Sequence, residues 1–360
     1  MTKSSYKPIF ELTRGDIVES IHFGSIAIVN AQNELLAWYG DPELITYLRS
    51  SAKPFQAMPF VERGGPQLYD LTLKEIALLC ASHSGTDEHV AVAQSIQAKT
   101  GVKESDLLCG VHMPGHRPTA ERMIKQDIKP VPNQHNCSGK HTGMVAFARM
   151  LGQPYSVNDQ PYIDPAHPIQ KIILQAFGEM CSYPASQVKV GIDGCSAPNF
   201  AVPLRSAALA FARLCDPSML EEPRQQACKT ITQAMTSYPE MIGGPDSFDT
   251  HLMQATHGKL VCKGGAEGYQ AIGVMPGVLG AGSPGLGITF KISDGDYRGR
   301  ARPAVSLEIL RQLGAITAGE LGVLAEYGPT YRVENWRKLL VGEAYPSFKL
   351  EHSAKSSPLP

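Results

Sequence analysis

Charged side chains and long apolar runs are scarce in this sequence of 360 residues. Charged residues make up 19% of the chain, below the roughly 25% typical of soluble domains, and the formal net charge is -1. A nearly neutral chain offers no electrostatic basis for binding nucleic acid or an anionic membrane surface. No apolar run approaches the ~20 residues needed to span a bilayer. The low charge instead predicts that much surface is buried inside a large fold or between subunits.

Closely paired cysteines are also lacking. The eight cysteines are scattered and form no Cys-x-x-Cys motif. In a chain this long, that pattern indicates reduced thiols rather than a disulfide framework. The polar first sixteen residues contain no apolar segment of signal-peptide type. We therefore expect a cytoplasmic protein, and the 43% of hydrophobic residues suffices for a large core.

The order of the predicted elements favours an α+β fold. A hairpin is expected at 16–39, helices follow through the middle of the chain, and strand-like runs return at 260–293. This order differs from the regular strand–helix alternation of a parallel doubly wound sheet. We predict one antiparallel sheet made of N- and C-terminal strands, with a helical cluster at about 64–258.

The expected organisation is a single domain. It would cover residues 15–330, after an N-terminal extension at 1–14. A C-terminal segment at 331–360 would follow, with a flexible Ser/Pro/Lys-rich end.

A serine and a lysine three residues apart, Ser50 and Lys53, stand at the start of a predicted helix. Residues at this spacing lie on one helical face, so the amine can take the proton of the hydroxyl. Serine needs such a base to act as a nucleophile. Taken alone the motif is weak, because a helix N-cap beside a solvated lysine has the same pattern.

Two later motifs strengthen the case for chemistry at Ser50. Ser82-His83-Ser84 follows a short apolar helix, and Lys263-Gly264-Gly265 ends a strand-like run. Ser-x-x-Lys, then Ser-x-polar, then Lys-x-Gly is the order of motifs in penicillin-binding proteins and serine β-lactamases. The second motif follows the first more closely than in a β-lactamase, so this resemblance is general.

A closer resemblance appears when further Gly-rich segments are included. Five segments are similar to signature segments of the Rhizobium etli-type (class 3) L-asparaginases, over roughly residues 15–330. They are Arg49-Ser50-Ser51-Ala52-Lys53-Pro54-Phe55, Cys80-Ala81-Ser82-His83-Ser84-Gly85, Asn136-Cys137-Ser138-Gly139-Lys140-His141, Gly191-Ile192-Asp193-Gly194-Cys195-Ser196 and Cys262-Lys263-Gly264-Gly265. The resemblance implies a serine β-lactamase-like α+β fold, a homodimer, and hydrolysis of L-asparagine to L-aspartate and ammonia.

The resemblance also implies two Ser-Lys tandems. Ser50, the predicted nucleophile, pairs with Lys53, and Ser82 pairs with Lys263. A lysine base must be neutral, and both burial and a nearby ammonium lower a lysine pKa. Ser82 would relay a proton to the leaving ammonia. Ser84 is the rival for that role, although a turn hydroxyl is the more ordinary interpretation.

A zinc site of Cys137, Lys140 and Cys195 is a further implication of the resemblance. Thiolates suit zinc, but lysine is a rare ligand because its amine must first lose a proton. Spacing alone favours buried thiols beside a surface lysine. Such a zinc would shape the substrate pocket rather than activate water. His141 would contact the metal's water or the substrate, or only pack at a helix start.

Recognition of the substrate needs a partner for each end of an amino acid. Arg49 is expected to pair with the α-carboxylate and Asp193 with the α-ammonium, for which Glu267 is a weaker candidate. Ala281, in a Gly-rich turn, would place backbone against the substrate. The alternatives are a surface salt bridge for Arg49 and turn roles for Asp193 and Ala281.

Two other functional classes remain open from the sequence. One is a glutaminase or another β-lactamase-like serine amidohydrolase. The other is a non-catalytic module that binds zinc or an amino acid.

Overall fold

The computed structural model describes residues 5–353. The chain divides into two compact units. Unit 1 is drawn from the chain up to Ser51, from Val202–Met219 and from Ala255 onward. Unit 2 comprises Ala52–Ala201 and Leu220–Gln254. Within residues 5–353, no helix has both the length and the apolar character needed to cross a membrane.

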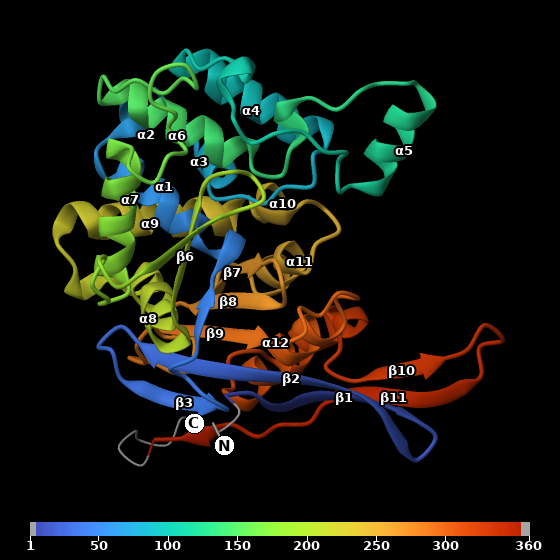
Figure 1. Cartoon of the computed structure of the whole chain (residues 1–360). Coiled ribbons are helices and arrows are strands. Elements are labelled where there is room, and N and C mark those ends of the chain that lie inside the picture. Colours follow the sequence, from blue (N-terminus) through green and yellow to red (C-terminus); the bar gives the residue numbers. More distant parts are fainter. Residues whose placement is uncertain (1–4, 354–360) are drawn as a thin grey trace. The chain divides into compact units, whose positions relative to one another are not determined.

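Unit 1 is built on a large antiparallel sheet whose strands come from both ends of the chain (Figure 1). Along the sheet the order is β10 (Tyr331–Glu334), β11 (Leu340–Pro346), β1 (Lys7–Arg14), β2 (Ile17–Asn30), β9 (Leu286–Ile292), β8 (Tyr269–Val274) and β7 (Leu260–Gly265). β3 (Leu35–Tyr39) pairs with β2, and β12 (Glu351–His352) pairs with β3. The predicted α+β class, with N- and C-terminal strands in one antiparallel sheet, is confirmed.

Helices cover this sheet closely. Residues 25–31 along and just beyond β2 are all buried, so both faces of the strand are covered. α8 (Leu204–Cys215) packs on β2, β8 and β9. A Cβ at Gly287 would stand 1.7 Å from the carbonyl oxygen of Ala208, so only glycine permits this approach. α12 (Ala301–Gln312) contacts β1, β8 and β11.

The remaining elements of unit 1 are short. They are β4 (Ile45–Tyr47), α13 (Ala318–Val323) and 3-10 helices at Arg49–Ala52, Pro217–Met219 and Ala325–Tyr327, of which the first ends across the unit boundary.

Unit 2 is mainly helical. α1 (Lys53–Glu62) is its central helix, because every residue from Lys53 to Val61 is buried and the helix contacts α6, α7 and α9. The other helices are α2 (Gly65–Leu68), α3 (Leu73–Leu79), α4 (Asp87–Thr100), α5 (Arg117–Lys125), α6 (Ser138–Met150), α7 (Pro168–Met180), α9 (Glu222–Ser237), α10 (Pro239–Gly243) and α11 (Phe248–Ala255). A β-hairpin of β5 (Lys189–Ile192) with β6 (Pro198–Pro203) carries the Asp193 loop.

The expected domain boundaries do not coincide with these units. Residues 7–14 form β1 and residues 331–352 contain β10 to β12, so the supposed extension and C-terminal segment are strands of the sheet. The prediction of a flexible end falls partly on residues 354–360, which lie outside the described residues.

Candidate active site

Lys53 and Ser82 form a direct contact in unit 2. Lys53 is the first residue of α1 and is 1% exposed. Its Nζ lies 2.7 Å from Ser82 Oγ, 2.6 Å from the Ala81 carbonyl oxygen and 3.3 Å from the Asn136 carbonyl oxygen. As an ammonium, the group has a proton for each of these oxygens; as a neutral amine, it has a lone pair that can accept the Ser82 proton.

The close packing of α6 on α3 creates this contact. A Cβ at Gly139 would stand 2.2 Å from the carbonyl oxygen of Leu78, so glycine lets the start of α6 meet the end of α3. The residues just before α6 then lie beside Ala81 and Ser82. The backbone N–H of Ser82 donates to the Ile242 carbonyl at 2.8 Å, which fixes the Ser82 loop.

The environment of Lys53 favours the neutral amine. Burial lowers the pKa of Lys53, and the positive charge of Lys140 lowers it further, while the neighbouring thiols Cys137 and Cys195 act in the opposite direction. The net result is a pKa below the ordinary lysine value. This is the direction that a general base requires.

The Ser50 segment belongs to unit 1, where it lies against the strand that carries Lys263. The hydroxyl of Ser51 donates to the Lys263 carbonyl oxygen at 2.6 Å. A Cβ at Gly265 would stand 2.4 Å from the Leu48 carbonyl oxygen. Arg49, directly before Ser50, has a φ of +51°, a strained value for a residue with a side chain. Backbone packing therefore holds the predicted nucleophile in place.

Ser82 and Lys53, which the resemblance places in different tandems, are in direct contact. The pairing of Ser82 with Lys263 stays a prediction. Lys263 is 1% exposed, and its Nζ donates to the Gly264 carbonyl oxygen at 2.9 Å. Sequence spacing cannot reveal the Lys53–Ser82 contact, because the Gly139–Leu78 packing produces it.

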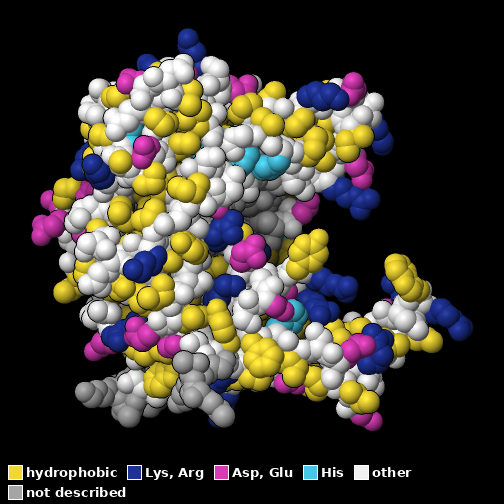
Figure 2. All heavy atoms as spheres, in the orientation of Figure 1, with side chains coloured by type: hydrophobic (Ala, Val, Ile, Leu, Met, Phe, Trp, Pro, Cys, Tyr) yellow, Lys and Arg dark blue, Asp and Glu magenta, His cyan; other side chains and the backbone are white. Residues whose placement is uncertain are grey.

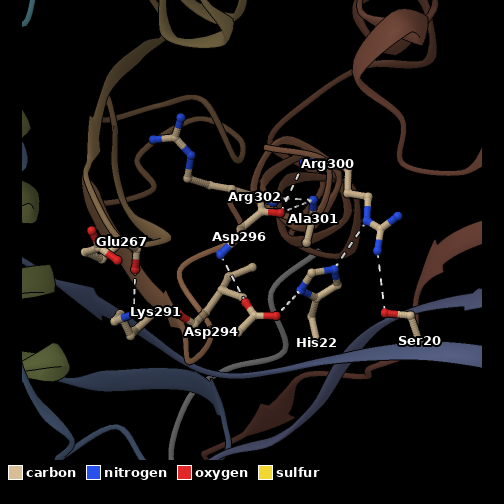
Figure 3. Close-up of polar contacts among 10 residues, drawn as sticks. Ser20, His22, Glu267, Lys291, Asp294, Asp296, Arg300, Ala301 and Arg302 are labelled. Atoms are coloured by element: carbon tan, nitrogen blue, oxygen red, sulfur yellow. Dashed lines mark hydrogen bonds and ion pairs between the residues drawn. The ribbon is translucent and has the colours of Figure 1, made fainter. Parts of the chain in front are cut away.

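A polar network fixes the turn that follows Gly265 (Figure 3). Lys291 donates to the carbonyl oxygen of Glu267, a residue with a φ of +59°. The Asp296 carboxylate accepts N–H groups of Arg300, Ala301 and Arg302 at the start of α12. Asp296 was not among the predicted site residues, although an Asp a few residues before a helix is a recognised start signal.

Arg49 and Glu267 are near neighbours at this turn. Arg49 Nη1 lies 3.9 Å from Glu267 Oε1, and the Glu267 side chain is 71% exposed. An exposed pair at this distance contributes little to stability.

Ala281 lies in an exposed turn of unit 1. The turn follows the pairing of Val274 with Leu286, at the end of β8 opposite to Tyr269 and Gly265. Lys263 pairs with Ala271, three residues or about 10 Å from that end of the strand. A contact of Ala281 with the substrate stays a prediction.

Cys137, Lys140 and Cys195 converge in unit 2, and all three are buried. Lys140 Nζ lies 2.9 Å from Cys195 Sγ. The hydrogen bond from the Cys195 thiol holds the pKa of Cys137 well below its usual range and raises that of Cys195. Burial alone lowers the pKa of Lys140, but the two neighbouring sulfurs raise it above the ordinary lysine value. Lys140 was expected from its spacing to be a surface residue, and this is wrong because the start of α6 is buried.

This cluster fits a metal ion only in part. Two sulfurs beside an amine are suitable donors for zinc, provided that the lysine loses its proton. Among residues 5–353, however, no group of three or more His, Cys, Asp or Glu side chains is arranged to hold a metal. The two cysteine sulfurs are therefore strong ligands, whereas Lys140 can bind a metal only after its amine has lost a proton.

His141 presents a buried ring nitrogen beside this cluster. The Tyr162 hydroxyl accepts the Leu108 N–H at 2.7 Å and lies 2.7 Å from His141 Nδ1. The other ring nitrogen, Nε2, is buried and has no hydrogen-bond partner within the described residues. An unsatisfied buried polar atom costs ~1–3 kcal/mol, which a water or a substrate group can offset.

Asp193 opens the loop between β5 and β6. Its backbone N–H donates to the Ala197 carbonyl oxygen, and its own carbonyl oxygen accepts the Ser196 N–H. Ser196 has a φ of +70°. The Asp193 Oδ1 accepts the Gly194 N–H at 2.8 Å. The turn role is therefore observed.

Ser82 also lines a cavity of about 390 Å³ within unit 2. Its other lining residues are His83, Ser84, His112, Met113, Gly115, His116, Asn136, Gly243, Asp246 and Ser247. His112 accepts the Asn136 N–H through Nε2 at 3.1 Å, so it supports the residue whose carbonyl contacts Lys53. Sequence analysis missed His112 and His116; the histidines of the Gly/Pro-rich loop at 109–118 were the available signal.

One family comparison covers most of the chain. A model of the family described as L-asparaginase II matches residues 10–346. The chain belongs to this L-asparaginase II family, which supports L-asparagine hydrolysis as its activity. A comparison with curated protein sequences gave no match.

Solved structures with detectable similarity include two glutaminases and a β-lactamase. A Bacillus glutaminase is 11% identical over 81% of this chain and 91% of its own, with a TM-score of 0.38. The Bacillus subtilis glutaminase YbgJ, in covalent complex with 5-oxo-L-norleucine, is 11% identical over 82% and 89%, with a TM-score of 0.37. A Burkholderia ambifaria β-lactamase is 14% identical over 82% and 96%, with a TM-score of 0.36. These similarities are too low to assign a substrate or a residue role.

Proposed function

We propose that this chain hydrolyses L-asparagine through Ser50, with Lys53, Ser82 and Lys263 handling the protons. The observation that carries the proposal is the buried contact of Lys53 with Ser82, in a chain whose family hydrolyses this amide. A buried lysine with a lowered pKa beside a serine hydroxyl is a proton-transfer pair.

In the proposed reaction, Ser50 Oγ attacks the side-chain carbonyl carbon of asparagine. Lys53 or Lys263 takes the hydroxyl proton, and backbone N–H groups near Ser50 stabilise the oxyanion. The C–N bond then breaks, and Ser82 passes a proton to the departing ammonia. Water cleaves the resulting ester and releases L-aspartate. Arg49 would bind the α-carboxylate, while Asp193 would bind the α-ammonium and His141 would donate to a substrate oxygen.

Substitution of the nucleophile tests the proposal. Ser50→Ala should abolish ammonia release from L-asparagine, because no ester can form. Ser218→Ala, at an exposed serine, serves as the matched control and should match the wild type. Wild-type turnover by Ser50→Ala would exclude Ser50 as the nucleophile.

The alternative activities are separated by substrate comparison. Ammonia release from L-asparagine and L-glutamine, and cleavage of a chromogenic β-lactam, should be measured under one condition. A higher kcat/KM with glutamine or the β-lactam would favour the alternative hydrolases. Binding of asparagine without any turnover would favour a non-catalytic module.

We also propose that Cys137, Cys195 and deprotonated Lys140 hold a zinc ion that shapes the pocket. The ion would fix the cluster and neutralise its thiolates. Protein purified without chelator should contain nearly one zinc per chain, and Cys137→Ser should lose it. A fully active native protein without metal would remove zinc from any required role.

The oligomeric state and location remain proposals. We propose a cytoplasmic homodimer, in keeping with the low charged fraction. Exposed apolar side chains on the β10–β11 hairpin support a contact surface (Figure 2); Trp336, Leu339 and Leu340 are at least half exposed there. Sedimentation velocity should give about twice the 38.9 kDa chain mass, and a monomer at micromolar concentration would contradict the proposal.

A further inference from the structure

We propose that the cavity beside Ser82 is a leaving-group pocket, and that the chain hydrolyses β-aspartyl amides carrying a polar substituent on nitrogen, such as β-linked dipeptides. This inference rests on the proposed function, in which Ser82 gives its proton to the departing amine. The departing amine must lie beside Ser82 Oγ to receive this proton, and Ser82 lines the cavity.

The cavity is far larger than ammonia requires. A water-sized molecule needs roughly 10–15 Å³ of such volume. The Ser82 cavity has about 390 Å³, within the ~300–1,000 Å³ range of small-molecule pockets. The excess space can hold an amine that bears several further non-hydrogen atoms, such as an amino acid.

Hydrogen-bonding side chains make up a large part of the lining. Ser84, His112, His116, Asn136, Asp246 and Ser247 contribute such side chains, and Met113 is the one large apolar side chain in the lining. These groups can pair with a leaving group that has its own carboxylate or hydroxyl groups.

One hydroxyl in the lining, that of Ser84, needs a hydrogen-bond partner. Ser84 Oγ is buried and, within residues 5–353, has no hydrogen-bond partner. Glycine at Gly244 leaves room for it, because a Cβ there would stand 2.0 Å from Ser84 Oγ. A polar group in the cavity would satisfy this hydroxyl.

A histidine at the cavity can recognise a leaving carboxylate. His116 Nε2 lies 3.7 Å from Asp246 Oδ2, and the Asp246 side chain is 78% exposed. The exposed Asp246 can move away, so the ring nitrogen is able to pair with the α-carboxylate of a leaving amino acid.

The reaction steps are those of asparagine hydrolysis, but the leaving group is a substituted amine in place of ammonia. Ser50 Oγ forms a bond to the β-carbonyl carbon, the C–N bond breaks, and the proton delivered through Ser82 converts the amide nitrogen to the free amine. Water then cleaves the ester. The net reaction consumes one dipeptide and one water and gives aspartate and the second amino acid.

Comparison of two substrates tests the inference. β-L-aspartyl-L-serine and L-asparagine should be incubated with the full chain, and the release of serine, aspartate and ammonia quantified by chromatography. We expect a kcat/KM for the dipeptide within tenfold of that for asparagine. Hydrolysis of asparagine alone would overturn this inference and leave the proposed function intact. Hydrolysis of neither substrate would overturn both.

A variant that fills the cavity provides a second test. Gly115 lines the cavity, and a Cβ there would meet only ordinary contacts, the nearest being Ser84 Cα at 3.8 Å. Gly115→Phe should lower the dipeptide-to-asparagine ratio of kcat/KM at least tenfold. Gly322→Phe is the matched control, because a Cβ at this exposed glycine would have no atom within 4 Å, and it should leave the ratio unchanged. An unchanged ratio in Gly115→Phe would overturn the inference.

Discussion

Lys53 combines burial with contact to a serine hydroxyl. Its Nζ meets Ser82 Oγ and the Ala81 carbonyl, and its pKa lies below the ordinary lysine value because the side chain is buried. A buried ammonium would be costly, so the arrangement favours a group that exchanges protons over one that stays charged.

Removal of this amine should abolish most of the activity without unfolding the chain. We expect Lys53→Met to lower kcat at least ~100-fold, the usual scale for loss of a general acid or base. Asparagine turnover and circular dichroism would be measured together, with exposed Lys349→Met as the control. Activity within threefold of wild type would show that another group handles the Ser82 proton.

Individual residues were predicted from the sequence when the signal was local. Ser50, Lys53, Ser82 and Lys263 stand in short motifs whose order is itself informative. The contact of Lys53 with Ser82 could not be predicted, because it depends on how two helices pack. Ala281 was predicted from its Gly-rich turn alone, and its role at the substrate stays a prediction.

At the scale of elements, the junction of α3 with α6 organises the unit 2 part of the site. Gly139 permits the junction, since any larger residue would meet the Leu78 carbonyl oxygen. The junction brings Asn136 beside Lys53 and Cys137 beside Cys195.

Gly139→Ala should therefore affect both stability and activity. The added methyl group would lower the free energy of unfolding by about 1–3 kcal/mol, as overpacking commonly does. It should also lower kcat, because the Asn136 carbonyl would shift from Lys53. Chemical denaturation and turnover would measure both, with Gly322→Ala as the control. A variant as stable and active as the control would contradict the packing argument.

The central helices and the hairpin at 16–39 were predicted from local signals, such as turn residues and helix caps. Thr86, for example, caps α4. β1 and β10 to β12 were missed because their sequences mix polar and apolar residues without strong alternation, and their strand character comes from pairing with partners far away in the sequence. Such pairing leaves little local signal.

For the whole molecule, buried histidines predict sensitivity to mild acid. Burial holds the pKa of His83 well below the ordinary value and lowers that of His89, whose ring stacks on His83 at 4.8 Å. In the unfolded chain both would titrate near ~6.5. Below that pH the unfolded state binds more protons than the folded state, so stability falls as pH falls.

We expect the free energy of unfolding to be lower at pH 5 than at pH 7.5, by up to ~1.4 kcal/mol per pH unit for each histidine. His89→Gln should make this slope shallower, because one titrating group is removed. Denaturant unfolding across this range would measure the slope. An identical slope in the variant would assign the acid sensitivity to other groups.

The sheet of unit 1 also has a consequence for biosynthesis. The Glu343 N–H donates to Thr13 Oγ1 across 330 residues, whereas the hydrogen bonds of Lys53 to oxygen atoms of unit 2 span 28, 29 and 83 residues. On the ribosome, β1 and β2 emerge first, yet β11 and β9 are the last of their partners to be synthesised. The nascent chain must therefore carry two unpaired strand edges while the helices of unit 2 form, and exposed edges invite aggregation. Yield in a heterologous host should accordingly depend on chaperones that shield the N-terminal hairpin until translation ends.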